Sequence, residues 1–151
     1  IDMNKIELGT RVIGLEFTVT TDSQIGYTKR KINKTLSADE SFIINDTSSK
    51  TGSSPIDVII KCKQAGDLAL SYSFNNKERT TRINNCSNGE IISINNMQVV
   101  TSSLSSHDVM EDFNFSFPKI YTSVKSTVNT FRVNIPCDIE IKYELRRKVG
   151  I

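Results

Sequence analysis

The chain has 151 residues, the length of one domain, and a chain of this size buries about two thirds of its unfolded surface in one core. Its composition, 37% hydrophobic and 24% charged, is ordinary for a folded protein, and no apolar run approaches the roughly 18 residues of a membrane span. The formal net charge of +2 is too small to predict nucleic acid as a partner. We therefore expect a single domain over residues 1–151, with no membrane span and no nucleic-acid binding.

The first segment with a clear strand pattern covers residues 15–21. Apolar and polar side chains alternate there, which is the pattern of a strand that covers a core with one face. A short apolar run follows at 42–44, and residues 45–55 have the composition of a loop, so we expect a mobile tip there. The apolar side chains of the first segment are Leu15, Phe17 and Val19.

The middle of the chain is predicted to be a meander of short antiparallel strands. Apolar and polar residues alternate over 56–62 and 68–74, with a turn between them. A more polar strand over 79–86 leads to an Asn-Gly dipeptide at 88–89, which readily adopts the two positive φ angles of a type I′ turn. We therefore expect a hairpin in which a return strand at 90–94 pairs with the preceding strand.

The C-terminal part contains the longest regular pattern of the chain. Residues 104–112 allow one short helix, because Ser105 or Ser106 suits its N-cap and the acidic residues that follow suit its first turn. Residues 131–145 alternate without a break, which predicts a strand with one face on the core. Pro136 donates no ladder hydrogen bond, so we expect a bend, a bulge or an edge position there. The basic triplets at 29–31 and 146–148 are predicted to be solvated surface.

Many short strands, almost no helix and no alternation of strands with helices together predict an all-β protein. Such strands form either an antiparallel sandwich or a barrel. We expect an antiparallel β-sandwich of the immunoglobulin-like kind with little or no helix.

The three cysteines leave one thiol unpaired in any intramolecular disulfide scheme, and they lack the spacing of a zinc site. A Cys62–Cys86 bridge closes a local loop, although in a meander one strand separates the two residues. A Cys62–Cys137 bridge joins two inward faces across a sandwich, as in immunoglobulin domains, and leaves Cys86 exposed. Because an exposed thiol is a liability in an oxidising compartment, the first bridge is favoured. No metal site is predicted.

The chain offers little for catalysis. His107 is its only histidine, and although Ser106 and Asp108 flank it, catalytic triads are assembled from distant segments. We therefore predict a surface histidine. Acidic residues of the segment 131–145 fall on the outward face of the predicted strand, where they do not face each other across a cleft. No cofactor-binding motif is present, so we predict neither enzymatic activity nor a cofactor.

The strand at 15–21, followed by a Ser-, Thr- and Asn-rich all-β body, resembles fimbrial subunits of the bacterial chaperone–usher pathway. The resemblance implies an incomplete immunoglobulin-like sandwich that a neighbour's N-terminal segment completes by β-augmentation. Leu15, Phe17 and Val19 then match the donor residues. The implied partners are like subunits through strand exchange, and a periplasmic chaperone during assembly. The basic triplet after the last strand suits a tip adhesin, which binds a host surface receptor instead.

These features predict a secreted or cell-surface structural or adhesive subunit of a fimbrium. The alternative is a stand-alone extracellular binding module that recognises carbohydrate or protein, with Tyr27, Tyr121 and Tyr143 as candidate contacts. The chain opens at Ile1 without an initiator Met or the features of a leader, which is compatible with export after removal of a leader.

Overall fold

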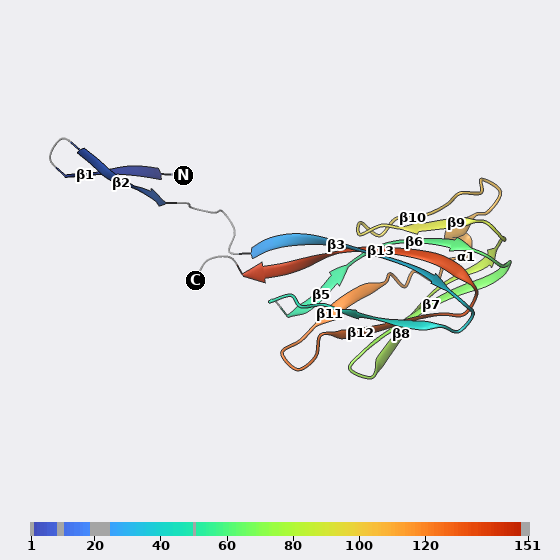
Figure 1. The fold of residues 1–151 in the computed structure, drawn as a ribbon. Helices are drawn as coiled ribbons and strands as arrows, with labels where there is room; N and C mark the ends of the chain where they lie inside the picture. The colour runs from blue at the N-terminus through green and yellow to red at the C-terminus, as the bar shows by residue number, and fades with distance from the viewer. Residues whose placement is uncertain (1, 9–10, 19–24, 50, 149–151) are drawn as a thin grey trace.

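The computed structural model describes residues 2–8, 11–18, 25–49 and 51–148, which form thirteen strands and one short helix (Figure 1). The prediction of an all-β protein with little helix is confirmed. None of the helices in the described part of the chain has the length and apolar character of a membrane span. The strands are β1 (Asp2–Leu8), β2 (Arg11–Thr18), β3 (Ile25–Leu36), β4 (Ser41–Asn45), β5 (Gly52–Pro55), β6 (Asp57–Cys62), β7 (Gly66–Phe74), β8 (Lys77–Cys86), β9 (Ile91–Ile94), β10 (Val100–Ser102), β11 (Lys119–Thr122), β12 (Val128–Val133) and β13 (Cys137–Lys148), and the helix is α1 (Val109–Asp112).

Two antiparallel sheets make up the body of the protein. One has the strand order β10-β9-β6-β13-β3, and the other has the order β4-β12-β7-β8. Strands β5 and β11 pair with each other in a small additional sheet. Strands β1 and β2 form a hairpin with a sheet of its own, which Figure 1 shows apart from the sandwich. The predicted antiparallel sandwich is therefore confirmed.

Eight strands of the two sheets follow the connectivity of a jelly roll. When β3, β4, β6, β7, β8, β9, β12 and β13 are lettered B to I, the sheets are B-I-D-G and C-H-E-F. This arrangement of two Greek keys is one way in which two-sheet sandwiches are wound. Figure 1 shows the long pair β3 and β13 running the length of the body. The fold shares its sandwich architecture with immunoglobulin-like domains and has jelly-roll connectivity.

Four crossovers between the two sheets lie together at one end of the sandwich. They connect β3 to β4, β6 to β7, β8 to β9, and β12 to β13. The register shows this directly, because Cys137 at the start of β13 pairs with both Leu36 at the end of β3 and Cys62 at the end of β6. We call this the crossover end. It brings together residues that are far apart in the sequence.

The core lies between the sheets and is built from the inward residues of the alternating strands. Phe131 is fully buried and stacks on Phe42, with ring centroids 5.5 Å apart, and on Tyr72 at 6.1 Å. In β13 the buried residues alternate with more exposed ones, as the sequence pattern predicts. Each such apolar side chain contributes roughly 1.5 to 3 kcal/mol when fully buried.

The segment 131–145 belongs to two strands rather than one. β12 lies in the four-stranded sheet and β13 in the five-stranded sheet, and the chain crosses between them at 134–136. Pro136 lies in this crossover, where its carbonyl accepts a hydrogen bond of 2.9 Å from the amide of Lys63. The expected bend at Pro136 is present as this crossover, whereas the prediction of one strand over 131–145 is wrong.

The predicted meander and its Asn-Gly hairpin are wrong. β8 pairs with β7, whereas β9 pairs with β6 and β10 in the opposite sheet. Gly89 has a φ of 81°, but Asn88 is not among the described residues with positive φ, so the two angles of a type I′ turn are not both present. Residues 87–90 instead form a crossover, in which the Glu90 carboxylate accepts a 2.7 Å hydrogen bond from the amide of Ser87.

Two smaller predictions have different outcomes. The segment 45–55 contains β5, and Asp46 is buried there with hydrogen bonds from the Ser48 amide and the Thr122 hydroxyl, so it is not simply a mobile tip. The helix expected within 104–112 is present as α1, with Asp108 as its N-cap rather than a serine.

Candidate functional site

A hollow of about 440 Å³ lies over β3 and β13, at the end of the sandwich opposite the crossover end. Its volume falls within the range of small-molecule sites in proteins, about 300 to 1,000 Å³. Residues of β5, β6 and the turn after β9 complete its lining. We call it the basic pocket, because its charged residues are five cations, Lys29, Arg30, Lys31, Lys142 and Arg146, against the two carboxylates Asp57 and Glu144.

The basic pocket exists because β3 and β13 are neighbouring strands, which brings the triplet at 29–31 close to Arg146, the first residue of the other triplet. β3 and β13 pair antiparallel over their whole length, which places Lys31 opposite Lys142, Lys29 opposite Glu144 and Tyr27 opposite Arg146. The prediction of solvated surface holds for Lys29, but Arg146 is half-buried. The site was missed because a sequence pattern does not show which strands are neighbours.

Two of the five cations are already paired within the sheet. Glu140 binds Lys31 at 2.7 Å and Lys142 at 3.0 Å, and the hydrogen bond from Lys31 is the main reason that the pKa of this carboxyl lies below its usual range. In the part of the chain that the structure describes, Lys29 and Arg146 form no ion pair. The pocket therefore has positive charge available for an acidic group.

Arg146 is the unusual residue of the pocket. Its Nε and Nη2 atoms are buried, and neither has a hydrogen-bond partner among the described residues. Its backbone is held, since the amide donates to the Ser48 hydroxyl at 2.9 Å and the carbonyl accepts from the Ser49 amide at 2.7 Å. Burying unpaired donors of a charged group costs free energy that a hydrogen-bond acceptor would recover. The guanidinium is thus suited to a carboxylate or another planar acidic group.

Two of the three tyrosines that the sequence suggested as contacts lie in the basic pocket. Tyr27 is 61% exposed and Tyr143 is half-buried, and burial is the main reason that the pKa of Tyr143 is raised. Tyr121 lies elsewhere, stacked on Phe74 with ring centroids 5.6 Å apart. The pocket therefore combines an exposed aromatic ring with the guanidinium directly opposite it in the sheet.

The disulfide predicted for Cys62 is not formed, because all three cysteines are buried thiols. The geometry assumed for each scheme is also wrong. Cys62 and Cys137 lie on neighbouring strands of one sheet instead of across the sandwich, and Cys86 belongs to the opposite sheet and is buried rather than exposed. The S–H of Cys86 donates to the Ile83 carbonyl at 3.6 Å, and the nearby Cys86 thiol lowers the pKa of Cys62.

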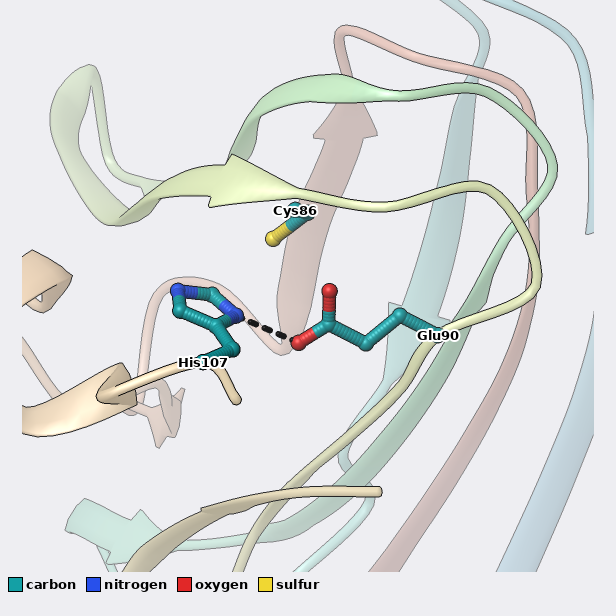
Figure 2. Close-up of side chains that lie close together, drawn as sticks. All are labelled: Cys86, Glu90 and His107. Carbon is teal, nitrogen blue, oxygen red and sulfur yellow. Dashed lines mark hydrogen bonds and ion pairs between the residues drawn. The ribbon is translucent and has the colours of Figure 1, made fainter. Parts of the chain in front are cut away.

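His107 is not the surface histidine that we predicted, because its side chain is only 8% exposed. Its Nδ1 lies 2.5 Å from Oε1 of Glu90, and its Nε2 lies 3.1 Å from Oδ2 of Asp112. Figure 2 shows the Glu90 carboxylate and the Cys86 sulfur both directed toward the imidazole. Nothing in the local sequence indicates this, because the partner carboxylate lies 17 residues away on another crossover.

Glu90 and His107 form a buried ion pair. Burial raises the pKa of Glu90, but hydrogen bonds from Ser102, Ser87 and His107 outweigh it and leave that pKa below its usual value. Burial likewise lowers the pKa of His107, but the hydrogen bond and charge of Glu90, helped by Asp112, more than reverse this and raise it. The contact therefore favours the ionised carboxylate of Glu90 and the protonated imidazole of His107.

The proposed donor residues are only partly described. Leu15 and Phe17 lie on β2, where their backbones pair with Lys5 and Met3 of β1. Val19 lies outside the described residues. The donor role stays a prediction.

The architecture places the chain among all-β sandwich proteins with jelly-roll connectivity, and it carries a basic pocket at one end. The comparisons with known proteins identify its family. A model of the family described as Phage tail C-terminal domain matches residues 25–143, and the chain belongs to that family. No curated protein and no solved structure matches it. The chain is accordingly a structural domain of a phage tail, and the protein is extracellular or virion-associated.

Proposed function

We propose that this domain is a surface-binding module of a phage tail that recognises an acidic saccharide of the host surface in the basic pocket. The observation that carries the proposal is Arg146, which lines a pocket with an excess of cations and whose Nε and Nη2 donors have no acceptor among the described residues. A uronic-acid carboxylate supplies the two coplanar oxygens that such a guanidinium binds best. The proposal is one of binding, and the absence of enzymatic activity stays a prediction.

The aromatic residues of the pocket favour a saccharide over a free anion. Tyr27 lies opposite Arg146 across the β3–β13 ladder and is largely exposed, so its ring is available as a flat apolar surface. Tyrosine combines an apolar ring with a polar hydroxyl, which suits a sugar with apolar and hydroxylated faces. Jelly rolls also occur among lectins and viral capsids, and this analogy of fold adds only general support.

The test is calorimetric titration of the protein with a uronic-acid oligosaccharide and with the same oligosaccharide after reduction of its carboxylates. We expect binding of the acidic form alone. Arg146→Gln should weaken it about tenfold or more, since a hydrogen bond to a charged group is worth roughly 1.5 to 3 kcal/mol. Arg147→Gln is the matched control, because Arg147 carries the same charge on the same strand but does not line the pocket. The proposal is contradicted if both variants lose the same affinity for the acidic saccharide, or if the wild-type protein binds both saccharides with equal affinity.

A second proposal concerns attachment to neighbouring tail subunits. β1 and β2 hydrogen-bond to each other in a sheet that includes no other described strand. An isolated two-stranded hairpin is at best marginally stable in water, so docking against a partner would stabilise it. This is the strand exchange expected from the fimbrial resemblance, in which an exposed sheet edge accepts an added strand. The test is whether Phe17→Asp abolishes association of the protein while Thr18→Asp does not.

A further inference from the structure

Three side chains with metal-binding atoms converge at the crossover end, away from the basic pocket. Cys86 comes from the end of β8, Glu90 from the crossover that follows it, and His107 from the segment before α1. The sulfur, a carboxylate oxygen and an imidazole nitrogen all lie within 4.8 Å of one another. Figure 2 shows the three side chains directed toward a common point from different parts of the backbone.

We propose that Cys86, Glu90 and His107 bind a structural zinc ion, with the thiol of Cys62 as the fourth ligand. Thiolate, imidazole and carboxylate are the ligands that zinc takes in proteins, and structural sites are closed and four-coordinate. Cys62 is buried beside the crossover that carries Glu90, since its amide donates to the Glu90 carbonyl at 2.9 Å and its carbonyl accepts from the Gly89 amide at 2.8 Å. Its sulfur lies outside the 4.8 Å group of the other three donors and moves in when the ion binds. The zinc ion ties both sheets to the segment before α1.

The distances suit a site that closes by small side-chain movements. Zinc bonds of about 2.0 to 2.3 Å in a tetrahedron place the donor atoms about 3.3 to 3.8 Å apart. The three donors of Cys86, Glu90 and His107 lie within 4.8 Å, and the closest pair, His107 Nδ1 and Glu90 Oε1, lies 2.5 Å apart. Binding therefore separates the ion pair and draws the sulfur inward.

The groups around the ligands are those that orient a metal site. Metal-binding histidines usually donate their second ring N–H to a carboxylate, and His107 Nε2 lies 3.1 Å from Asp112. The Glu90 carboxylate is held by the Ser87 amide at 2.7 Å and by the Ser102 hydroxyl at 2.6 Å. Asp112 is in turn held by the side-chain amide of Asn85 at 3.0 Å. Asp112 is thus a positioning residue for the Nδ1 atom of His107.

A simple buried ion pair of Glu90 and His107 does not explain the position of Cys86. A neutral thiol gains little beside an ionised carboxylate, whereas a zinc-bound thiolate next to a carboxylate and an imidazole is an ordinary arrangement. Binding releases the proton of each thiol and the proton that His107 Nδ1 shares with Glu90. Affinity for zinc should consequently fall as the pH is lowered.

The first experiment uses the full chain, without an affinity tag and purified without chelators. Elemental analysis should find about one zinc ion per chain, as a closed four-ligand site requires. Removing zinc with a chelator should lower the melting temperature, and Zn²⁺ but not Mg²⁺ should restore it. Co²⁺ in place of zinc should give the intense near-ultraviolet absorption of a cobalt–thiolate bond. The proposal is overturned if the purified protein contains no zinc, its melting temperature does not change when Zn²⁺ is added, and Co²⁺ gives no cobalt–thiolate absorption.

Variants then identify the ligands. Cys86→Ser and His107→Gln should lose stoichiometric zinc, Cys62→Ser should halve the cobalt–thiolate band, and Asp112→Asn should weaken zinc binding about 10- to 100-fold. Cys137→Ser is the matched control, since Cys137 is a buried thiol at the same end but outside the cluster, and it should keep both metal and band. A folded Cys86→Ser protein with an unchanged cobalt spectrum, or a Cys62–Cys86 disulfide in the purified protein, overturns the assignment. The wild-type measurements decide the question even if a variant fails to fold.

Discussion

Cys62 and Cys137 face each other across β6 and β13, two neighbouring strands of the five-stranded sheet. Both side chains are fully buried. The next pair along the ladder is Lys63 and Pro136, and there the Lys63 amide donates to the Pro136 carbonyl. In an antiparallel ladder hydrogen-bonded pairs alternate with pairs that have no hydrogen bond between them, so Cys62 and Cys137 form a pair of the second kind. The Cα atoms of such a pair lie about 4.5 Å apart in an ordinary sheet. Two thiols can therefore lie in contact inside the core without a covalent bond.

The first prediction is that all three thiols are reduced and protected in the native protein. Burial raises the pKa of Cys137 to about 11, which keeps it a thiol and slows its alkylation. Iodoacetamide should label none of the cysteines in the folded protein and all three after unfolding in guanidinium. A reducing agent should leave the melting temperature unchanged. Peptide mapping that finds a native disulfide at Cys62 contradicts this prediction.

The second prediction concerns the core. Phe131 is fully buried between Phe42 and Tyr72, so Phe131→Ala leaves a cavity between the sheets. It should lower the free energy of unfolding by about 3 to 5 kcal/mol, measured by urea denaturation. Val128→Ala on the same strand is the control, because Val128 is 42% exposed, and it should change stability by less than about 0.5 kcal/mol. Similar effects in both variants would mean that β12 does not cover the core.

The third prediction is a pH dependence of the metal-free protein, prepared with a chelator. The pKa of His107 is raised from 6.5, so its contribution to stability is complete below about pH 6.5 and is lost as the pH rises through the higher pKa of the folded state. The pKa of Glu90 is lowered from 4.5, so its contribution is complete above about pH 4.5 and is lost as the pH falls through the lower folded pKa. The ion pair should stabilise the fold most between these values.

The measurement compares the wild-type protein with the double variant Glu90→Gln and His107→Gln across pH 3 to 9. The difference between their melting temperatures should be largest at about pH 4.5 to 6.5 and should shrink on both sides. A difference that does not vary with pH would show that the pair is not ionised in the folded protein.

The sequence predicts the strands far better than their arrangement. Period-two alternation identifies which residues of 131–145 face the core, because it depends only on the geometry of a single strand. The same pattern does not distinguish a hairpin from a crossover, since a strand that changes sheets still turns one face to the core. For that reason the Asn-Gly dipeptide at 88–89 predicts a hairpin turn, whereas the structure has a crossover there.

Both candidate sites depend on which strands are neighbours and on where the chain crosses between the sheets, and the sequence pattern shows neither. Arg146 and Tyr27 are 119 positions apart in the numbering and meet only through the β3–β13 register, and Cys86 and His107 meet only because crossovers gather at one end. A buried cysteine and a buried histidine carry no local signal that separates them from surface residues. Charge offered a partial signal for the basic pocket, since both triplets are visible in the sequence, but the approach of 29–31 to Arg146 is a property of the sheet.

The last prediction tests whether the hairpin of β1 and β2 attaches the domain to a neighbour. Among the described strands β2 pairs only with β1, so a charge in place of one of its apolar residues should leave the sandwich intact. Phe17→Asp should therefore abolish association, measured by analytical ultracentrifugation, while the main melting transition stays within about 1 °C of that of the wild-type protein. Thr18→Asp, on the opposite face of the same strand, is the control and should associate normally.

The two other outcomes of the Phe17→Asp experiment exclude strand exchange for different reasons. If β2 were a core strand of this chain, the carboxylate would be buried without a partner, and the monomer itself would unfold at a lower temperature. If neither association nor melting changed, the hairpin would be peripheral to both assembly and folding. Only loss of association with an unchanged melting transition fits a segment whose apolar row packs in a neighbour's groove, where each buried side chain contributes roughly 1.5 to 3 kcal/mol to the contact.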